Sequence, residues 1–82
     1  KITSYKSLLI EWCQKHKKQF QYTVYEDSGN ETVKYFAVKL MIDDELVAKA
    51  RATSKKKAEE RASKRAFYKL KNQINPEALS KN

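Results

Sequence analysis

Hydrophobic residues recur at helical spacing near the start of the chain. In residues 5–16 they follow one another at intervals of three and four, which is typical of one face of an amphipathic helix. The residues on this face are Tyr5, Leu8, Leu9, Trp12 and His16. Thr3 or Ser4 is placed to cap the helix. The first predicted element is therefore a helix with one buried face.

Apolar and polar residues then alternate in three shorter stretches, as in strands with one buried face. These stretches are residues 20–25, 36–42 and 46–52. In the third stretch we expect Leu46 on the buried face with the alanines that follow it, and Val47 on the other face. The turn-forming residues 27–30 and the acidic residues 43–45 make short connections, which predict an antiparallel meander.

Helical spacing returns in residues 54–72, where Ala58, Ala62, Ala66 and Leu70 occupy every fourth position. Small side chains let a helix lie close to a sheet. Pro76 discourages further helix, so residues 73–82 are expected to form a polar, frayed tail. The predicted fold is α+β, in the order α-β-β-β-α, with both helices on one face of a three-stranded antiparallel sheet. A single domain is expected over residues 1–72.

Charge narrows the class of partner. The 82 residues include 18 Lys and Arg against 10 Asp and Glu, a formal charge of +8, which favours a nucleic acid or an anionic membrane. No apolar run approaches the ~20 residues of a spanning helix. We therefore expect no membrane contact and a cytoplasmic protein. Because the chain begins with Lys1 rather than Met, we expect it to be a piece of a longer protein.

The strongest functional signal is the run of Lys55, Lys56 and Lys57 after Ser54, at the start of the second predicted helix. Each cation in the first turn of a helix lowers the stability of the helix by roughly 0.3 to 1 kcal/mol, because the positive end of the helix dipole repels it. An external anion reverses this, because backbone N–H groups, the dipole and the ammonium groups then converge on one phosphate. The run favours phosphate binding, with a solvated lysine-rich helix start as the alternative.

The polar side of the first predicted helix is a second candidate surface. Ser7, Glu11 and Gln14 share this side. Such side chains can exchange hydrogen bonds with the 2′-hydroxyls and base edges that an A-form duplex displays in its wide minor groove. An ordinary solvated helix face is the alternative.

These features resemble the double-stranded RNA-binding domain family over residues 5–70. The matching motifs are Phe36-x-Val38 and Ser54-Lys55-Lys56-x-Ala58-Glu59. The run Tyr5-Lys6-Ser7-Leu8-Leu9-Ile10-Glu11, followed by Gln14, is similar to the C-terminal domain of bacterial ribonuclease III. The resemblance implies recognition of duplex RNA by shape across about 16 base pairs. Ser7, Glu11 and Gln14 would meet a minor groove, and Ser54, Lys55, Lys56 and Lys57 the phosphates of the next major groove.

The connection between the first two strands departs from the family. A Gly-Pro-x-His loop usually reads a second minor groove there, whereas this chain has Asp27-Ser28-Gly29-Asn30-Glu31-Thr32. Ser28 and Asn30 are the candidate contacts of this loop. We expect no catalytic residue, metal or cofactor within the chain itself. For the parent, the resemblance implies a homodimeric ribonuclease III whose separate catalytic domain uses Mg²⁺.

Two other functions remain open at this point. A single-strand binder would stack bases on the sheet, with Tyr25 and Tyr35 as candidate platforms. A protein-interaction domain of the same fold, with weak or no RNA binding, is the other alternative. The column Lys57, Arg61, Arg65 and Lys69 is interpreted mainly as a solvated face, and Cys13 and His16 as packing residues. Glu60 and Lys64 are expected to pair along their helix.

Overall fold

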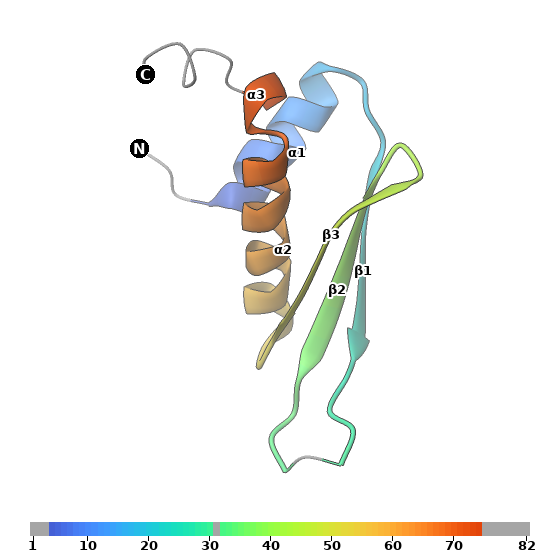
Figure 1. The fold of residues 1–82 in the computed structure, drawn as a ribbon, viewed down its shortest axis with the longest axis vertical. Coiled ribbons are helices and arrows are strands. Elements are labelled where there is room, and N and C mark those ends of the chain that lie inside the picture. Colours follow the sequence, from blue (N-terminus) through green and yellow to red (C-terminus); the bar gives the residue numbers. More distant parts are fainter. Residues whose placement is uncertain (1–3, 31, 75–82) are drawn as a thin grey trace.

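The chain forms two layers, with the helices covering one face of an antiparallel sheet (Figure 1). The computed structural model describes residues 4–30 and 32–74. The elements in order are α1 (Tyr5–Lys15), β1 (Phe20–Glu26), β2 (Phe36–Ile42), β3 (Glu45–Ala52), α2 (Lys55–Lys69) and α3 (Lys71–Ile74). The predicted α+β class and the three-stranded sheet are confirmed.

The strands lie in the order β1-β2-β3, so β3 is an edge strand next to α2. Tyr22 pairs with Leu40, and Leu40 pairs with Ala48. Because side chains alternate along a strand, this row faces the helices. Its neighbours Lys39 and Lys49 face the open side of the sheet. The face of the sheet that packs against the helices is therefore largely apolar, whereas the open face carries charged side chains.

A bulge in β3 overturns one prediction. Leu40 pairs with Ala48 but Met41 pairs with Leu46, which leaves Val47 as an extra residue. One inserted residue moves what precedes it to the opposite face. Leu46 is accordingly 44% exposed, whereas Val47 packs against the core. The expected positions of Leu46 and Val47 were thus wrong, because regular alternation does not reveal a bulge.

The acidic connection before β3 is a tight turn, as predicted. Asp43 and Asp44 have φ angles of 52° and 66°, the left-handed conformation that two-residue hairpin turns require. The Asp43 carboxylate also accepts the backbone N–H of Gln19 at 2.9 Å and lies 3.6 Å from the Lys18 ammonium. These contacts fix the turn to the segment that leads into β1.

The core lies between α1, α2 and the sheet. Leu9 and Cys13 of α1, Leu40 of β2 and Ala62 of α2 are all buried in it. Cys13 is a packing residue, as predicted, and burial raises the pKa of its thiol. His16 instead lies exposed at the end of α1, with its ring 5.4 Å from that of Trp12.

The C-terminal helix differs from the prediction of one continuous helix. α2 ends at Lys69 with Leu70 as its C-cap, and α3 follows. The break lets both Leu70 and Ile74 pack against the core, so the start of the expected tail is helical. Residues 75–82 of that tail lie outside the described residues.

Within residues 4–30 and 32–74, no helix is long and apolar enough to cross a membrane.

Candidate nucleic-acid interface

The first turn of α2 carries three cations around a capped helix N-terminus. The Ser54 hydroxyl accepts the backbone N–H of Lys57 at 3.1 Å, with Ser54 itself in extended conformation. Lys55, Lys56 and Lys57 are all exposed. The structure describes every residue of the first turn of α2, and none of them is acidic. The positive end of the helix dipole is therefore reinforced rather than neutralised, which is the electrostatic arrangement of an anion site.

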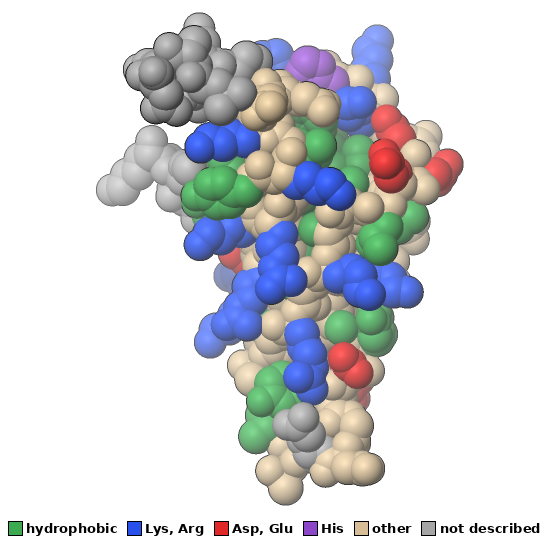
Figure 2. All heavy atoms as spheres, in the orientation of Figure 1, with side chains coloured by type: hydrophobic (Ala, Val, Ile, Leu, Met, Phe, Trp, Pro, Cys, Tyr) green, Lys and Arg blue, Asp and Glu red, His purple; other side chains and the backbone are tan. Residues whose placement is uncertain are grey.

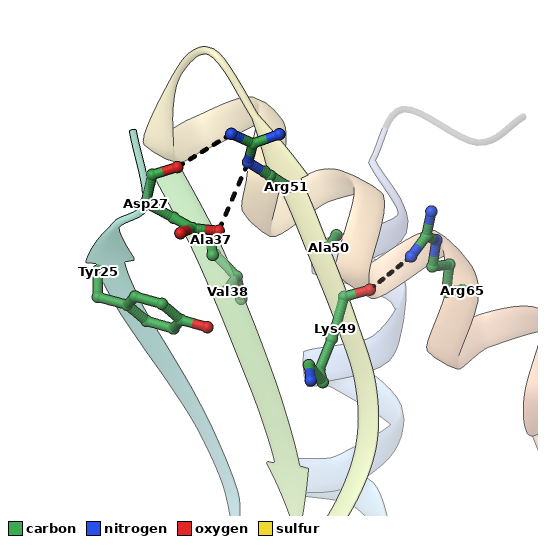
Figure 3. Close-up of a pocket in the computed structure, with 8 residues that line it drawn as sticks. All are labelled: Tyr25, Asp27, Ala37, Val38, Lys49, Ala50, Arg51 and Arg65. Carbon is green, nitrogen blue, oxygen red and sulfur yellow. Dashed lines mark hydrogen bonds and ion pairs between the residues drawn. The ribbon is translucent and has the colours of Figure 1, made fainter. Parts of the chain in front are cut away.

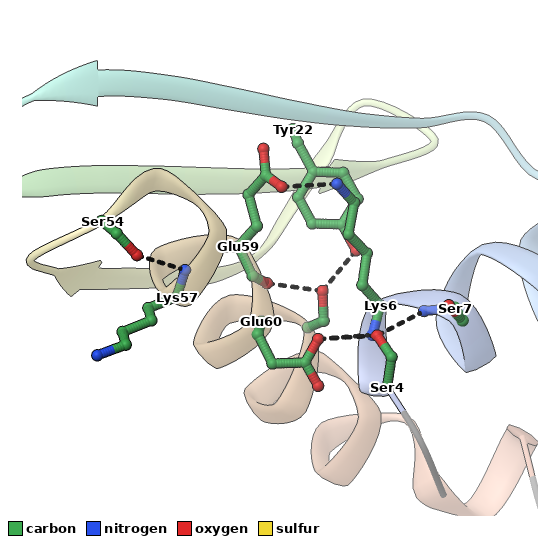
Figure 4. Close-up of polar contacts among 9 residues, drawn as sticks. Ser4, Lys6, Ser7, Tyr22, Ser54, Lys57, Glu59 and Glu60 are labelled. Atoms are coloured by element: carbon green, nitrogen blue, oxygen red, sulfur yellow. Dashed lines mark hydrogen bonds and ion pairs between the residues drawn. The ribbon is translucent and has the colours of Figure 1, made fainter.

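The three lysines diverge from this turn. The Lys55 ammonium lies over the Phe36 ring, 5.6 Å from its centroid, on the sheet side of the helix. Lys56 and Lys57 line a hollow of about 400 Å³ with Ser4 and Glu60, on the α1 side. Figure 4 shows Lys57 extending away from the helix axis. The lysines can thus reach separate phosphates rather than one.

The polar side of α1 is open. Ser7, Glu11 and Gln14 are all exposed, which confirms that the predicted surface is accessible. Ser4 caps this helix by accepting the Ser7 backbone N–H at 3.3 Å, as one of the two predicted caps. That these three side chains contact RNA stays a prediction.

Glu60 of α2 joins the two helices at the start of α1 (Figure 4). Its carboxylate accepts the backbone N–H of Tyr5 at 2.6 Å, the hydroxyl of Ser4 at 2.9 Å and the N–H of Lys6 at 3.4 Å. A carboxylate here satisfies free N–H groups and complements the α1 dipole. The predicted pairing of Glu60 with Lys64 is replaced by this contact, and the Lys64 ammonium instead lies 5.9 Å from the Tyr5 ring centroid.

A second acidic residue of α2 strengthens this connection. Glu59 forms an ion pair of 2.6 Å with Lys6 of α1, whose ammonium lies 5.1 Å from the Tyr22 ring centroid. The Tyr22 hydroxyl lies 2.6 Å from that of Ser63, which donates to the Glu59 carbonyl at 2.7 Å. Burial raises the pKa of Tyr22 to about 12. These contacts fix α1, α2 and β1 to one another behind the two candidate surfaces.

The connection between β1 and β2 supplies one accessible candidate and one structural residue. The Ser28 hydroxyl accepts the Tyr35 backbone N–H at 2.9 Å and donates to Glu26 at 3.2 Å. Gly29 follows with a φ of 60°, and Asn30 is exposed. Ser28 therefore closes the loop, whereas Asn30 is open to a ligand. RNA contacts by either residue remain predictions.

The basic column of α2 has a role that sequence spacing did not reveal. Arg61 donates to the carbonyl of Arg51 at 3.0 Å, and Arg65 donates to the carbonyl of Lys49 at 2.7 Å. Both acceptors belong to the edge strand β3, whose outer carbonyls would otherwise be open to pairing with another strand. These arginines are exposed, as expected, but they are fixed against the sheet.

The open face of the sheet holds the two tyrosines considered as stacking platforms. Tyr25 is 41% exposed. The ring of Tyr35 is covered by the Arg51 guanidinium, 4.0 Å from its centroid. A continuous aromatic platform is therefore missing among the described residues.

In the same part of the chain, no group of three or more His, Cys, Asp or Glu side chains could hold a metal ion.

The fold and these surfaces define a class of small RNA-binding domains, and comparison with known proteins gives the same answer. The chain belongs to the family described as double-stranded RNA binding motif, which matches residues 5–70. The predicted resemblance is thereby confirmed, and double-stranded RNA is the partner of this domain.

Within this family, the chain is similar to part of several curated proteins named Ribonuclease 3. The chain is 68% identical over 75 residues to Ribonuclease 3 of Zunongwangia profunda, covering 92% of the chain and 31% of the relative. It is 62% identical over 74 residues to Ribonuclease 3 of Flavobacterium psychrophilum, covering 90% and 30%. With Ribonuclease 3 of Streptococcus gordonii it shares 39% identity over 69 residues, covering 83% and 30%. The chain thus spans less than one third of the length of these relatives.

Proposed function

We propose that the chain positions duplex RNA for cleavage as one domain of a ribonuclease III. The high identity to proteins named Ribonuclease 3, over about 30% of their length, supports this proposal. Cleavage would belong to the remainder of such a protein. By resemblance, that part would use carboxylates and Mg²⁺ and would pair as a homodimer.

The observation that carries the RNA-binding mechanism is the first turn of α2. Ser54 orders its backbone, and Lys55, Lys56 and Lys57 surround it without an acidic neighbour in that turn. Phosphate oxygens would be held by the ammonium groups and the helix dipole together. Because such contacts ignore base identity, this part of the interface gives affinity and position rather than sequence preference.

The polar face of α1 would supply the discrimination between RNA and DNA. Glu11 is an acceptor, so it can receive a hydrogen bond from a 2′-hydroxyl or an exocyclic amine. Gln14 and Ser7 can both donate and accept. A DNA duplex lacks the 2′-hydroxyl and presents a narrower minor groove. The contacts of Glu60 and Glu59 with α1 hold this face at a fixed distance from the lysines.

Fluorescence anisotropy with matched duplexes of about 20 base pairs tests this mechanism. We expect tighter binding to duplex RNA than to duplex DNA or single-stranded RNA. Glu11→Ala/Gln14→Ala is expected to weaken binding to duplex RNA, whereas Gln21→Ala on the open face leaves it unchanged. Equal affinity for RNA and DNA duplexes would contradict the mechanism. Absence of binding to all three would favour the protein-interaction alternative.

A further inference from the structure

Basic side chains continue from the first turn of α2 across the edge of the sheet onto its open face. We name this series the basic track and define it as Lys57, Arg61, Arg65, Lys49 and Lys39. Figure 2 shows Lys and Arg side chains gathered across the middle of the molecule, over the helix and the sheet. All five residues are exposed.

Two hydrogen bonds build the crossing from one layer to the other. Arg61 and Arg65 donate to the carbonyls of Arg51 and Lys49, so their guanidinium groups lie against β3. Figure 3 shows the second of these contacts, in which Arg65 reaches from α2 to the strand that carries Lys49. Arginine has five donors in a rigid fork, so a guanidinium held at one carbonyl still has donors for a phosphate.

Two lysines face each other on the open side of the sheet. Lys39 of β2 pairs directly with Lys49 of β3. Like charges in this relation destabilise a sheet. Among residues 4–30 and 32–74, neither ammonium group has a carboxylate within ion-pair distance. An anion from outside the chain would relieve this repulsion.

A hollow of about 350 Å³ is lined by Lys49 together with Tyr25 and Arg51 (Figure 3). Its floor includes Ala37, which pairs with Tyr25 on one side and Arg51 on the other. The small alanine leaves space between them. Arg51 is held by Asp27 and lies over the Tyr35 ring, so that wall is fixed. Tyr25 is 41% exposed, and the Lys39 ammonium lies 5.9 Å from its ring centroid. The hollow therefore borders an aromatic ring that has a cationic group close to it.

We propose that the basic track binds single-stranded RNA that extends from the duplex held by α1 and α2. This inference rests on the proposed duplex binding. A single strand fits better than a second duplex, because the track turns around a sheet edge and the bases of a duplex are not free to stack on Tyr25. The track begins at Lys57, in the turn proposed to bind the duplex, and it passes the ring of Tyr25. Both features favour RNA over an acidic protein as the ligand.

The test compares a blunt RNA duplex of about 20 base pairs with the same duplex carrying about ten unpaired nucleotides on either strand. For the unmodified 82-residue chain, we expect an extension on at least one strand to raise affinity about tenfold, as one stacked base with its phosphates can do. Lys39→Gln/Lys49→Gln and, separately, Tyr25→Ala are expected to remove most of this advantage. Their affinities for the blunt duplex should stay within about twofold of the unmodified chain.

Lys64→Gln/Lys71→Gln is the matched control, because it removes the same charge from residues outside the track. It should retain the advantage of the extended duplex. Equal affinity of the unmodified chain for blunt and extended duplexes overturns the proposal, as does an equal loss in this control. Polyglutamate binding that depends on Lys39 and Lys49, without an extension effect, would assign the surface to an acidic protein. Failure to bind the blunt duplex would instead contradict the proposed function.

Discussion

The backbone N–H of Tyr5 donates to the Glu60 carboxylate at 2.6 Å, across 55 residues of sequence. This bond joins the first turn of α1 to the second turn of α2. The predicted minor-groove side chains begin at Ser7, and the lysines proposed to bind phosphate end at Lys57, close to the two ends of this bond. One carboxylate therefore helps to set the distance between the two candidate surfaces.

Replacement of Glu60 tests its structural contribution. Glu60→Ala is expected to lower the free energy of unfolding by about 1–3 kcal/mol, because it leaves the N–H groups at the start of α1 without their charged acceptor. Glu60→Gln keeps an acceptor and should lose less. Urea denaturation followed by the fluorescence of Trp12 measures this. Glu11→Gln, an exposed carboxylate, is the control, and equal stability of Glu60→Ala and Glu11→Gln would contradict the assignment.

Ser54 separates helix capping from phosphate binding. Ser54→Asp keeps a good N-cap and adds a negative charge beside the three lysines, so stability is expected to stay equal or rise by up to about 1 kcal/mol. Affinity for duplex RNA should nevertheless fall at least tenfold. Thermal denaturation and anisotropy measure the two effects. Ser54→Ala is the companion variant, expected to lose about 1 kcal/mol of stability with a smaller effect on affinity.

The hydroxyl of Tyr22 is expected to make the free energy of unfolding decrease as the pH rises through the alkaline range. Its pKa is raised to about 12 in the folded chain, above the ordinary value of 10.0. The folded state therefore favours the protonated phenol, and this contribution is complete below pH 10 and lost as the pH rises towards 12. Tyr22→Phe should remove this part of the alkaline decline, as measured by urea denaturation across that range. An unchanged decline in Tyr22→Phe, like that of the control Tyr25→Phe, would contradict it.

Local patterns predicted most of the fold and the exposed, lysine-rich first turn of α2. Helical spacing identified α1 and α2, and the chemistry of Ser54 and the lysines is contained within four consecutive residues. Alternation also located the strands. It could not reveal the bulge at Val47, because one extra residue leaves the composition of a strand unchanged while it reverses the faces.

Contacts between distant segments were beyond sequence reasoning. Glu60 has a plausible partner four residues later in Lys64, and only the packing of α1 against α2 shows that it caps Tyr5 instead. Arg61 and Arg65 likewise resembled a solvated column. Their bonds to β3 depend on how close α2 lies to the sheet edge, which no local pattern encodes.

Salt dependence of duplex RNA binding tests the central claim most directly. Affinity for a duplex of about 20 base pairs is measured over a salt series for the unmodified chain, for Lys55→Gln/Lys56→Gln and for the control Lys64→Gln/Lys71→Gln. If Lys55 and Lys56 each hold a phosphate, their replacement weakens binding and lowers the slope of log affinity against log salt by about two, whereas the control changes the slope little. A slope and affinity for Lys55→Gln/Lys56→Gln that match the control would contradict the account.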